Sequence, residues 1–323
     1  MDQNLRLRKT HGNSDVGISV VVPIYNEEEN IPDLYAELAK SFDSPAGAGV
    51  SVEFLFVNDG SVDSSLKLVK TLRETDSRVK LVDLSRNFGQ QAAITAGIDF
   101  SRGDAVILMD GDLQDPPSLL IQMIEIWKNG ADVVYAVRRK RKESALMRGT
   151  YYLYYRLLRK IANIDIPVDS GDFCLMDRRV IDQLKKMPER NRFLRGLRSW
   201  VGFNQVSLPY ERQARSAGEA KYTFRKLLQL GLSGIFSFSS FPLRLATYLG
   251  FAVCLIGVIS LAVVVAAYFI GGSPPQGWTS LFVLVLFIGG VQLLILGAIG
   301  EYVALIHDEV KQRPNYVIRE FLD

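Results

Sequence analysis

Cysteine and histidine are scarce in this 323-residue chain, which contains two of each. Cys174 and Cys254 lie far apart and in no metal-ligand spacing, which argues against a disulfide framework and fits a reducing compartment. His11 and His307 lie near the two ends of the sequence. We therefore expect a chemistry that depends neither on a central histidine nor on paired thiols.

A strong charge imbalance and the common phosphate-binding loops are also missing. The chain has 38 Lys and Arg against 35 Asp and Glu, a net charge of +3. No long basic stripe with interleaved aromatic residues occurs, so nucleic acid is not an expected partner. No glycine-rich phosphate loop occurs, which argues against a nicotinamide-binding or ATP-hydrolysing fold. Residues 1–15 are polar and lack the apolar core of a signal peptide, so we expect a disordered N-terminus.

Charged residues are absent from residues 245–300. Two runs there, residues 245–270 and 279–300, are each long enough to cross about 30 Å of hydrocarbon, and a Gly- and Pro-rich loop separates them. We predict a hairpin of two transmembrane helices within residues 245–306, preceded by interfacial amphipathic helices at residues 224–244.

Basic residues flank this uncharged region on both sides, whereas the loop between its two runs has none. The positive-inside rule therefore predicts a multi-pass protein with its soluble part and both termini in the cytoplasm, and with residues 307–323 as a cytoplasmic tail. Small residues would allow close helix approach and a homo-oligomer. These are Gly289, Gly290, Gly297 and Gly300.

Residues 16–223 have the pattern of a soluble α/β domain. Short apolar runs alternate there with helical stretches, which predicts a doubly wound, mostly parallel sheet. The predicted strands are residues 18–23, 52–57, 80–84, 105–109, 132–137 and about 206–210. Ligands bind such sheets at the carboxyl ends of the strands.

The run at residues 105–109 is the centre of the pattern, because it ends abruptly in an Asp-Gly-Asp sequence. Asp110 and Asp112 can hold a hard divalent cation, which keeps water and substrate phosphates as its other ligands. The pattern therefore suggests a metal-bound diphosphate. For Asp115 we favour a helix N-cap, with Pro116 at the first helical position.

Polar residues also follow the earlier predicted strands. Asp59 could accept a hydrogen bond from a base edge, and Arg86 could pair with phosphate. The alternative is ordinary turn chemistry, because Asn, Asp, Gly and Ser favour turns for local reasons. For any one of these residues alone, the two interpretations stay open.

Four segments in order, VVPIYNE, VNDGS, RNFG and DGDLQDP, resemble glycosyltransferase family 2. The resemblance covers nearly the whole chain and points to the membrane-anchored polyprenyl-phosphate branch. It implies a GT-A fold, a nucleotide-sugar donor, and Mg²⁺ or Mn²⁺ held by Asp110 and Asp112, with Asp112 catalytic. The residues that it implies for the nucleotide are Pro23, Tyr25, Asn26, Glu27, Asp59, Gly60, Ser61, Arg86, Asn87, Gly89, Asp110 and Gly111.

The acceptor side of the site is expected further along the chain. A basic run begins at Arg138 and includes Arg148, and it suits an anionic lipid head group, an anionic membrane surface or a plain solvated helix. Residues 168–176, which include Asp169 and the run Gly171-Asp172-Phe173, resemble the branch's Gly-Asp-Phe segment near the acceptor. The resemblance makes Asp172 a candidate base or positioning group.

Residues 212–222 resemble the branch's loop that closes over donor and acceptor phosphates. The resemblance implies that Arg215 and Lys221 contact these phosphates. Ala220 and Thr223 depart from the branch's usual residues, which puts a hydroxyl role at position 220 in doubt but leaves the basic pair.

With this resemblance, the sequence predicts inverting transfer from a nucleotide sugar, with UDP-glucose as the expected donor, to polyprenyl phosphate at the bacterial cytoplasmic membrane. The alternatives are a GDP-mannose or aminoarabinose-type donor, a processive polysaccharide synthase, and a non-catalytic membrane scaffold. The synthase pattern Gln-x-x-Arg-Trp is missing around Arg198 and Trp200, and the intact carboxylates argue against the scaffold.

Overall fold

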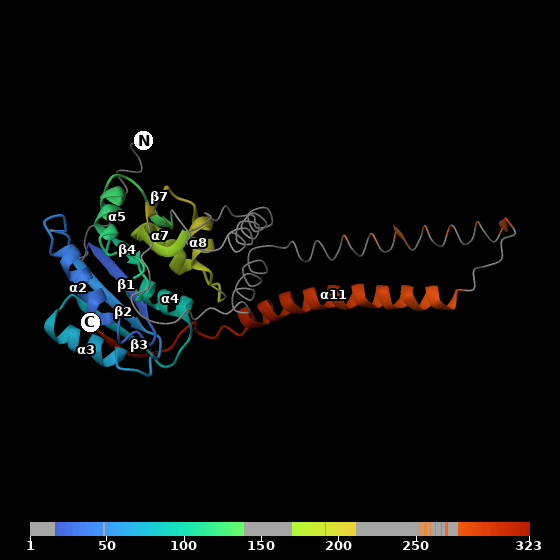
Figure 1. Cartoon of the computed structure of the whole chain (residues 1–323), viewed down its shortest axis with the longest axis horizontal. Coiled ribbons are helices and arrows are strands. Elements are labelled where there is room, and N and C mark those ends of the chain that lie inside the picture. Colours follow the sequence, from blue (N-terminus) through green and yellow to red (C-terminus); the bar gives the residue numbers. More distant parts are fainter. Residues whose placement is uncertain are drawn as a thin grey trace. The chain divides into compact units, whose positions relative to one another are not determined.

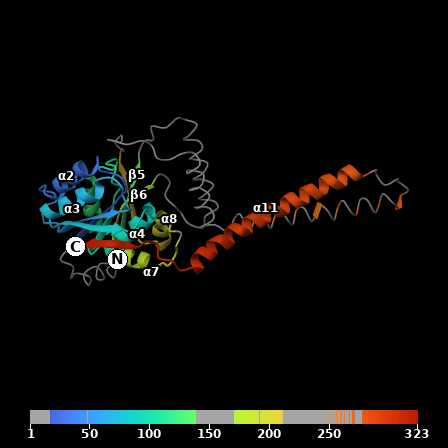
Figure 2. The same cartoon turned by 90° about the horizontal axis from the view of Figure 1, so that it is seen from below.

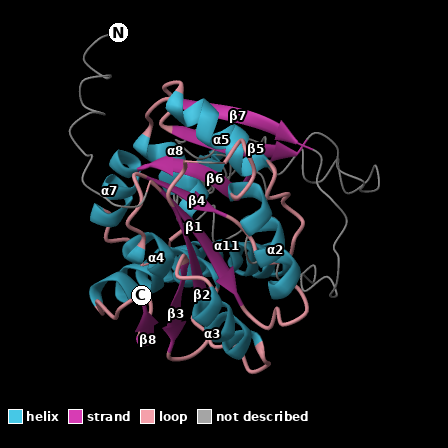
Figure 3. Ribbon diagram, turned by 90° about the vertical axis from the view of Figure 1, so that its left-hand side faces the viewer, coloured by secondary structure: helices cyan, strands magenta, loops and turns pink. Residues whose placement is uncertain are grey.

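The computed structural model describes residues 17–47, 49–138, 170–190, 192–210 and 277–323, with isolated residues between 248 and 270. In this part of the chain an eight-stranded sheet has the order β7-β5-β6-β4-β1-β2-β3-β8 (Figure 3). The strands are β1 Ile18–Ile24, β2 Val52–Asn58, β3 Val79–Leu84, β4 Ala105–Leu108, β5 Val133–Arg138, β6 Ser170–Asp177, β7 Gln205–Tyr210 and β8 Ile318–Leu322. Only β6 and β8 oppose the common direction of these strands, so the predicted mostly parallel α/β fold is confirmed.

The strands predicted before β6 are all found, each within a residue of the expected bounds. Both β1 and β2 are buried almost throughout, because helices cover the sheet on both sides. Parallel strands that are buried on both faces have near-continuous apolar sequences, which explains why their runs were easy to recognise.

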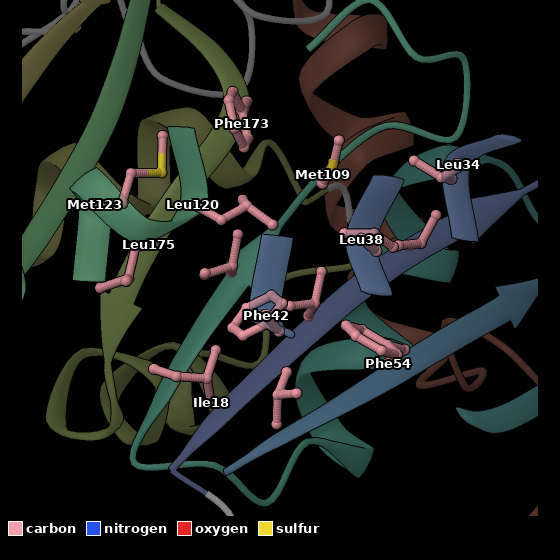
Figure 4. Packing of buried hydrophobic residues seen from close by; sticks show 14 of the residues in the cluster. Ile18, Leu34, Leu38, Phe42, Phe54, Met109, Leu120, Met123, Phe173 and Leu175 are labelled. Atoms are coloured by element: carbon pink, nitrogen blue, oxygen red, sulfur yellow. The ribbon is translucent and has the colours of Figure 1, made fainter. Parts of the chain in front are cut away.

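Six described helices pack on the sheet. On one face α2 contacts α3 and α5, and on the other α7 contacts α4 and α8 (Figures 1 and 3). Their bounds are α2 Ile31–Phe42, α3 Ser65–Thr75, α4 Gln90–Phe100, α5 Leu119–Lys128, α7 Arg178–Lys186 and α8 Leu194–Val201. Figure 4 shows the core beneath α2, where the rings of Phe42 and Phe54 meet edge to face with centroids 5.7 Å apart.

The antiparallel strand β6 sets the geometry of the site. It pairs with β4 so that Ala105 faces Asp177 and Leu108 faces Cys174. The start of β6 therefore lies beside the carboxyl end of β4. Continued by two residues, the same register sets Asp172 opposite Asp110.

The C-terminal segment adds a strand to the sheet. Within residues 307–323, which the sequence suggested as a tail, β8 pairs with β3 in antiparallel fashion. In Figure 2 this strand is the red arrow at the C-terminus. Arg313–Asp323 belongs to the same compact unit as the sheet, whereas the described residues between Tyr222 and Gln312 belong to a second unit. A five-residue strand is too short for its periodicity to be distinguished from a tail.

The second unit contains the long helix α11, Trp278–Val310. It begins where the second membrane run was predicted and continues past Gly300, because Glu301 does not interrupt the helix. Among the described residues this is the one helix long and apolar enough to cross a membrane, over Phe287–Val310. The predicted two-helix hairpin is therefore not confirmed. Its first helix lies almost entirely outside the described residues, as do the interfacial helices and the N-terminus.

Candidate functional site

The turns after β1 and β2 are joined by hydrogen bonds. Asn26 N donates to Ser61 Oγ at 3.0 Å, and Val62 N donates to Asn26 Oδ1 at 2.9 Å. Glu27 N donates to Ser65 Oγ at 2.9 Å. Asn26 has a φ of 53°, a left-handed conformation that asparagine tolerates better than most residues. These two turns therefore form one rigid unit at the carboxyl edge of the sheet.

The turn after β2 also holds the loop after β3. Asp59, buried at 3% exposure, accepts hydrogen bonds from Phe88 N at 2.7 Å and Gly89 N at 3.0 Å. Burial raises the pKa of the Asp59 carboxyl, and the two backbone donors partly offset this. Gly60 has a φ of +69°, and a Cβ on it would lie 2.5 Å from the Arg86 carbonyl carbon. Glycine is required here for both reasons.

The other residues expected to contact the nucleotide surround these turns. Pro23 lies in β1 opposite Val57, and Tyr25 is 39% exposed at the end of that strand. The Glu27 carboxylate accepts from Asn30 Nδ2 at 2.6 Å.

The loop after β3 presents polar groups to solvent. Arg86 and Asn87 are both exposed. The Arg86 guanidinium lies 4.6 Å from the centroid of the Phe88 ring, and Gly89 turns the chain into α4 with a φ of +98°. An exposed cation on a fixed loop suits phosphate, and this role of Arg86 stays a prediction.

Negative charge concentrates at the end of β4. Asp110 accepts from Gln90 Nε2 at 2.8 Å. Burial, followed by the charges of Asp172, Asp115 and Asp112, raises the pKa of Asp110 to about 7, against an opposing effect of Arg195. A site that resists ionisation in this way favours a cation.

Among the described residues, no group of three or more His, Cys, Asp or Glu is arranged to hold a metal ion by itself. Two carboxylates fit a cation that also binds water and substrate phosphates, as Mg²⁺ does.

The residues after Asp110 form a strained turn. Gly111 packs closely on β1, since a Cβ there would lie 3.3 Å from the Pro23 carbonyl oxygen. Asp112 Oδ1 accepts from Gln114 N at 3.2 Å, and Leu113 has a φ of 57°. Positive φ at leucine carries strain, which is commonly found at functional sites.

The predicted capping role of Asp115 is wrong. The helix α5 begins at Leu119, with Ser118 at the cap position. Pro116 and Pro117 delay the helix, because a residue before proline is disfavoured in the α conformation. Asp115 is instead buried at 2% exposure and accepts a hydrogen bond from the hydroxyl of Tyr210.

Asp172 is held by an arginine that the sequence analysis missed. Arg195 on α8 donates from Nε to Asp172 Oδ1 at 2.7 Å and from Nη2 to Oδ2 at 3.1 Å. Leu194 N donates to Gln91 Oε1 at 3.1 Å, which fixes α8 to the start of α4. The sequence signal for these contacts was Gln90 and Gln91, two adjacent amide side chains at the start of α4, which bind Asp110 and the backbone of Leu194.

Several expected acceptor residues cannot be placed. Arg148, Asp169, Arg215 and Lys221 lie outside the described residues. Arg138 ends β5, where its backbone pairs with Tyr210, and its side chain is not described. Their phosphate-binding roles stay predictions.

Comparison with known proteins identifies the family. Residues 19–185 match Glycosyl transferase family 2. The chain is 48% identical over 303 residues to the glycosyltransferase YkcC of Bacillus subtilis, covering 94% of this chain and 93% of that protein. It is 42% identical over 304 residues to a prophage-derived bactoprenol glucosyl transferase of Shigella flexneri, covering 94% and 97%. An Escherichia coli K12 prophage bactoprenol glucosyl transferase homolog gives 42% over 303 residues, covering 94% and 98%. The chain therefore belongs to glycosyl transferase family 2, in the polyprenyl-phosphate branch.

Proposed function

We propose that this enzyme transfers a sugar, with inversion, from UDP-glucose to polyprenyl phosphate on the cytoplasmic face of a bacterial membrane. The observation that carries the proposal is an acidic cluster at the carboxyl edge of the sheet, made of Asp110, Asp112, Asp115 and Asp172. The turns after β1, β2 and β3 lie at the same edge. Support for the lipid acceptor comes from the relatives named bactoprenol glucosyl transferases.

The donor nucleotide would bind at the linked turns. Tyr25, Glu27 and Asp59 would line the base and ribose, and Arg86 would contact the diphosphate. The hydrogen bonds between these turns fix them before the donor arrives. Such preorganisation reduces the ordering that binding requires.

Asp110 and Asp112 would hold Mg²⁺ or Mn²⁺ together with the donor diphosphate. The bound cation would offset the negative charge that develops on the leaving diphosphate. The fit rests on the donor set, because two carboxylates are hard oxygen ligands. Burial and then the neighbouring carboxylate charges raise the pKa of Asp110, and a bound cation would offset both.

The acceptor needs little activation by the protein. A phosphate monoester has its second pKa near about 6, so it is mostly a dianion at neutral pH. Its oxygen would attack the anomeric carbon while the bond to the diphosphate breaks on the opposite face. Asp172 would then position the acceptor or a neighbouring group, and its bidentate pairing with Arg195 supports that role over proton abstraction.

The membrane part would hold the lipid near this site. We propose two transmembrane helices, with α11 as the second, and a cytoplasmic sheet domain. The lipid phosphate would be contacted or covered by the expected acceptor residues, which are Arg138, Arg148, Asp169, Arg215 and Lys221.

The test is sugar transfer by the purified full-length protein. Radiolabelled UDP-glucose, GDP-mannose and a UDP-aminoarabinose-type sugar are offered with polyprenyl phosphate, with and without Mg²⁺ or Mn²⁺. We expect metal-dependent label in the lipid fraction from UDP-glucose, lost in Asp112→Ala and retained in Asp33→Ala. Asp33 is a suitable control because it is an exposed carboxylate on α2.

Each other result points to a specific alternative. Lipid label from GDP-mannose alone would replace the donor and keep the reaction. A long polymer would favour a processive synthase. Nucleotide binding without transfer to any acceptor would favour a non-catalytic scaffold.

A further inference from the structure

The last strand brings Arg319 to the carboxyl end of β3. Asp83 pairs with Glu320 and Leu84 with Ile318, so the register skips Arg319. Such irregularities redirect a side chain and often occur next to active sites. Arg319 Nη1 lies 3.3 Å from Asp83 Oδ2, and its Nη2 donates to the Ser85 carbonyl at 2.7 Å.

Asp83 connects this arginine to the turns at the sheet edge. Asp83 is 1% exposed, and its Oδ1 accepts from Asn58 Nδ2 at 2.7 Å. Asn58 Oδ1 accepts from Ser61 N at 3.1 Å, and Ser61 Oγ accepts from Asn26 N at 3.0 Å. A continuous series of hydrogen bonds thus runs from β8 across β3 and β2 to the turn after β1.

Both backbone polar groups of Ser85 bind the C-terminal segment, one at Val317 just before β8 and one at Arg319 within β8. Its N–H donates to the Val317 carbonyl at 2.8 Å, and its carbonyl accepts from Arg319. Ser85 begins the loop that carries Arg86. The Asp59 carboxylate accepts hydrogen bonds from Phe88 N and Gly89 N at the far end of that loop. The strand β8 and Asp59 therefore fix the loop at its two ends.

Because Asp83 is buried, the arrangement around its carboxylate depends on the charge of Arg319. A buried carboxylate that loses a cationic partner keeps its desolvation penalty, so its surroundings rearrange or admit water. Asn58 must hold its amide in one orientation to donate to Asp83 and accept from Ser61. If Asp83 rearranges, the Asn58 amide is no longer held in that orientation. The hydrogen bond from Ser61 N to Asn58 Oδ1 is then weakened as well.

We propose that Arg319 is a positioning residue for donor binding, acting through Asp83 and Asn58 on the turn at Ser61 and through Ser85 on the loop that carries Arg86. The inference rests on the proposed function, in that these turns bind the nucleotide. Only residues 311–317 separate α11 from β8. The segment that leaves the candidate membrane helix is thus part of the scaffold of the donor site.

The experiment compares two neighbouring substitutions in the full-length protein. Arg319→Gln removes the guanidinium, and Glu320→Gln removes the ion pair with Lys70 at 2.6 Å. Both remove a salt bridge of β8, but only Arg319 belongs to the series. UDP affinity with Mn²⁺ is measured by calorimetry, and hydrogen exchange is measured over residues 58–62.

We expect about tenfold weaker UDP binding in Arg319→Gln and a change below about twofold in Glu320→Gln. Exchange over residues 58–62 should quicken in Arg319→Gln alone. Arg319→Lys should restore part of the affinity, because a lysine supplies a point charge but not the fork that bridges two acceptors.

Two results would overturn the inference. Equal effects of both glutamine variants would mean that β8 merely stabilises the sheet, and unchanged exchange over residues 58–62 in Arg319→Gln would mean that the series transmits nothing. Failure of the proposed function is recognised separately, because the unmodified protein would then bind no UDP while the exchange comparison still decides the role of Arg319.

Discussion

Arg195 engages both carboxylate oxygens of Asp172, with its Nε 2.7 Å from Oδ1 and its Nη2 3.1 Å from Oδ2. The Asp172 side chain is 7% exposed and that of Arg195 is 29% exposed. A carboxylate in such a pair is a poor proton acceptor, because its charge is already stabilised. The pair instead fixes a guanidinium beside the acidic cluster.

We predict that Asp172→Asn raises the KM for polyprenyl phosphate about tenfold and leaves the pH profile of kcat in place, since the variant loses a positioning interaction of roughly 1.4 kcal/mol. Arg195→Ala should behave alike, and the double variant should be little worse than either single one, because one contact is removed in all three. Steady-state kinetics with varied lipid checks this. Loss of the acidic limb of the kcat profile in Asp172→Asn would make Asp172 the base.

The raised pKa of Asp110, about 7 against the usual 3.8 of an aspartate carboxyl, predicts a pH dependence of stability. Between these values the folded, metal-free protein binds a proton that the unfolded chain releases. The resulting stabilisation is complete below the unfolded pKa and is lost as the pH rises through about 7. Thermal melts in detergent should therefore show a stability that falls over this window, and less so in Asp110→Asn.

Metal binding must displace the same proton. At pH 6 Mn²⁺ binding should release a proton, and its affinity should rise with pH up to about 7 and then level off, because the ligand must ionise. Calorimetry in buffers of different ionisation enthalpy measures the release. Asp33→Asn serves as the control and should behave as the unmodified protein. Affinity that is independent of pH would contradict the pKa assigned to Asp110.

The sequence predicted the central strands because their apolar runs are local signals. The antiparallel entry of β6 was not predictable, because it depends on pairing between segments that are far apart, such as Leu108 with Cys174. The same holds for Arg195, whose helix is fixed by a bond from Leu194 to Gln91 across 103 residues. The capping role predicted for Asp115 was wrong for a local reason, because the two prolines that follow it delay the start of α5 to Leu119.

The glycines of α11 predict self-association in the membrane. Among the described residues, no atom lies within 4 Å of a Cβ built on Gly297 or Gly300. Gly297→Ile should lower the oligomeric mass in mild detergent and lipid discs, because it prevents close helix approach. Leu284→Phe adds bulk on another side of the helix and should not. A monomeric unmodified protein would refute the prediction.

The close approach of Gly60 to the loop after β3 gives a test that separates strain from displacement. Gly60 and Gly130 both have positive φ, +69° and +113°, but a Cβ at Gly130 meets nothing within 4 Å. Alanine at either site should cost about 1 kcal/mol of backbone strain. Only Gly60→Ala should also push the backbone of Arg86 and Asn87 away.

We therefore expect a loss of thermal stability in both variants, larger in Gly60→Ala because backbone must shift there, and about tenfold weaker UDP binding in Gly60→Ala alone. Because Gly130→Ala carries backbone strain without displacing a neighbour, the difference in UDP binding between the two variants measures what the position of the loop contributes to the donor site. Equal UDP affinity in both variants would show that the loop carrying Arg86 adapts freely, and it would remove Arg86 from the proposed nucleotide contacts.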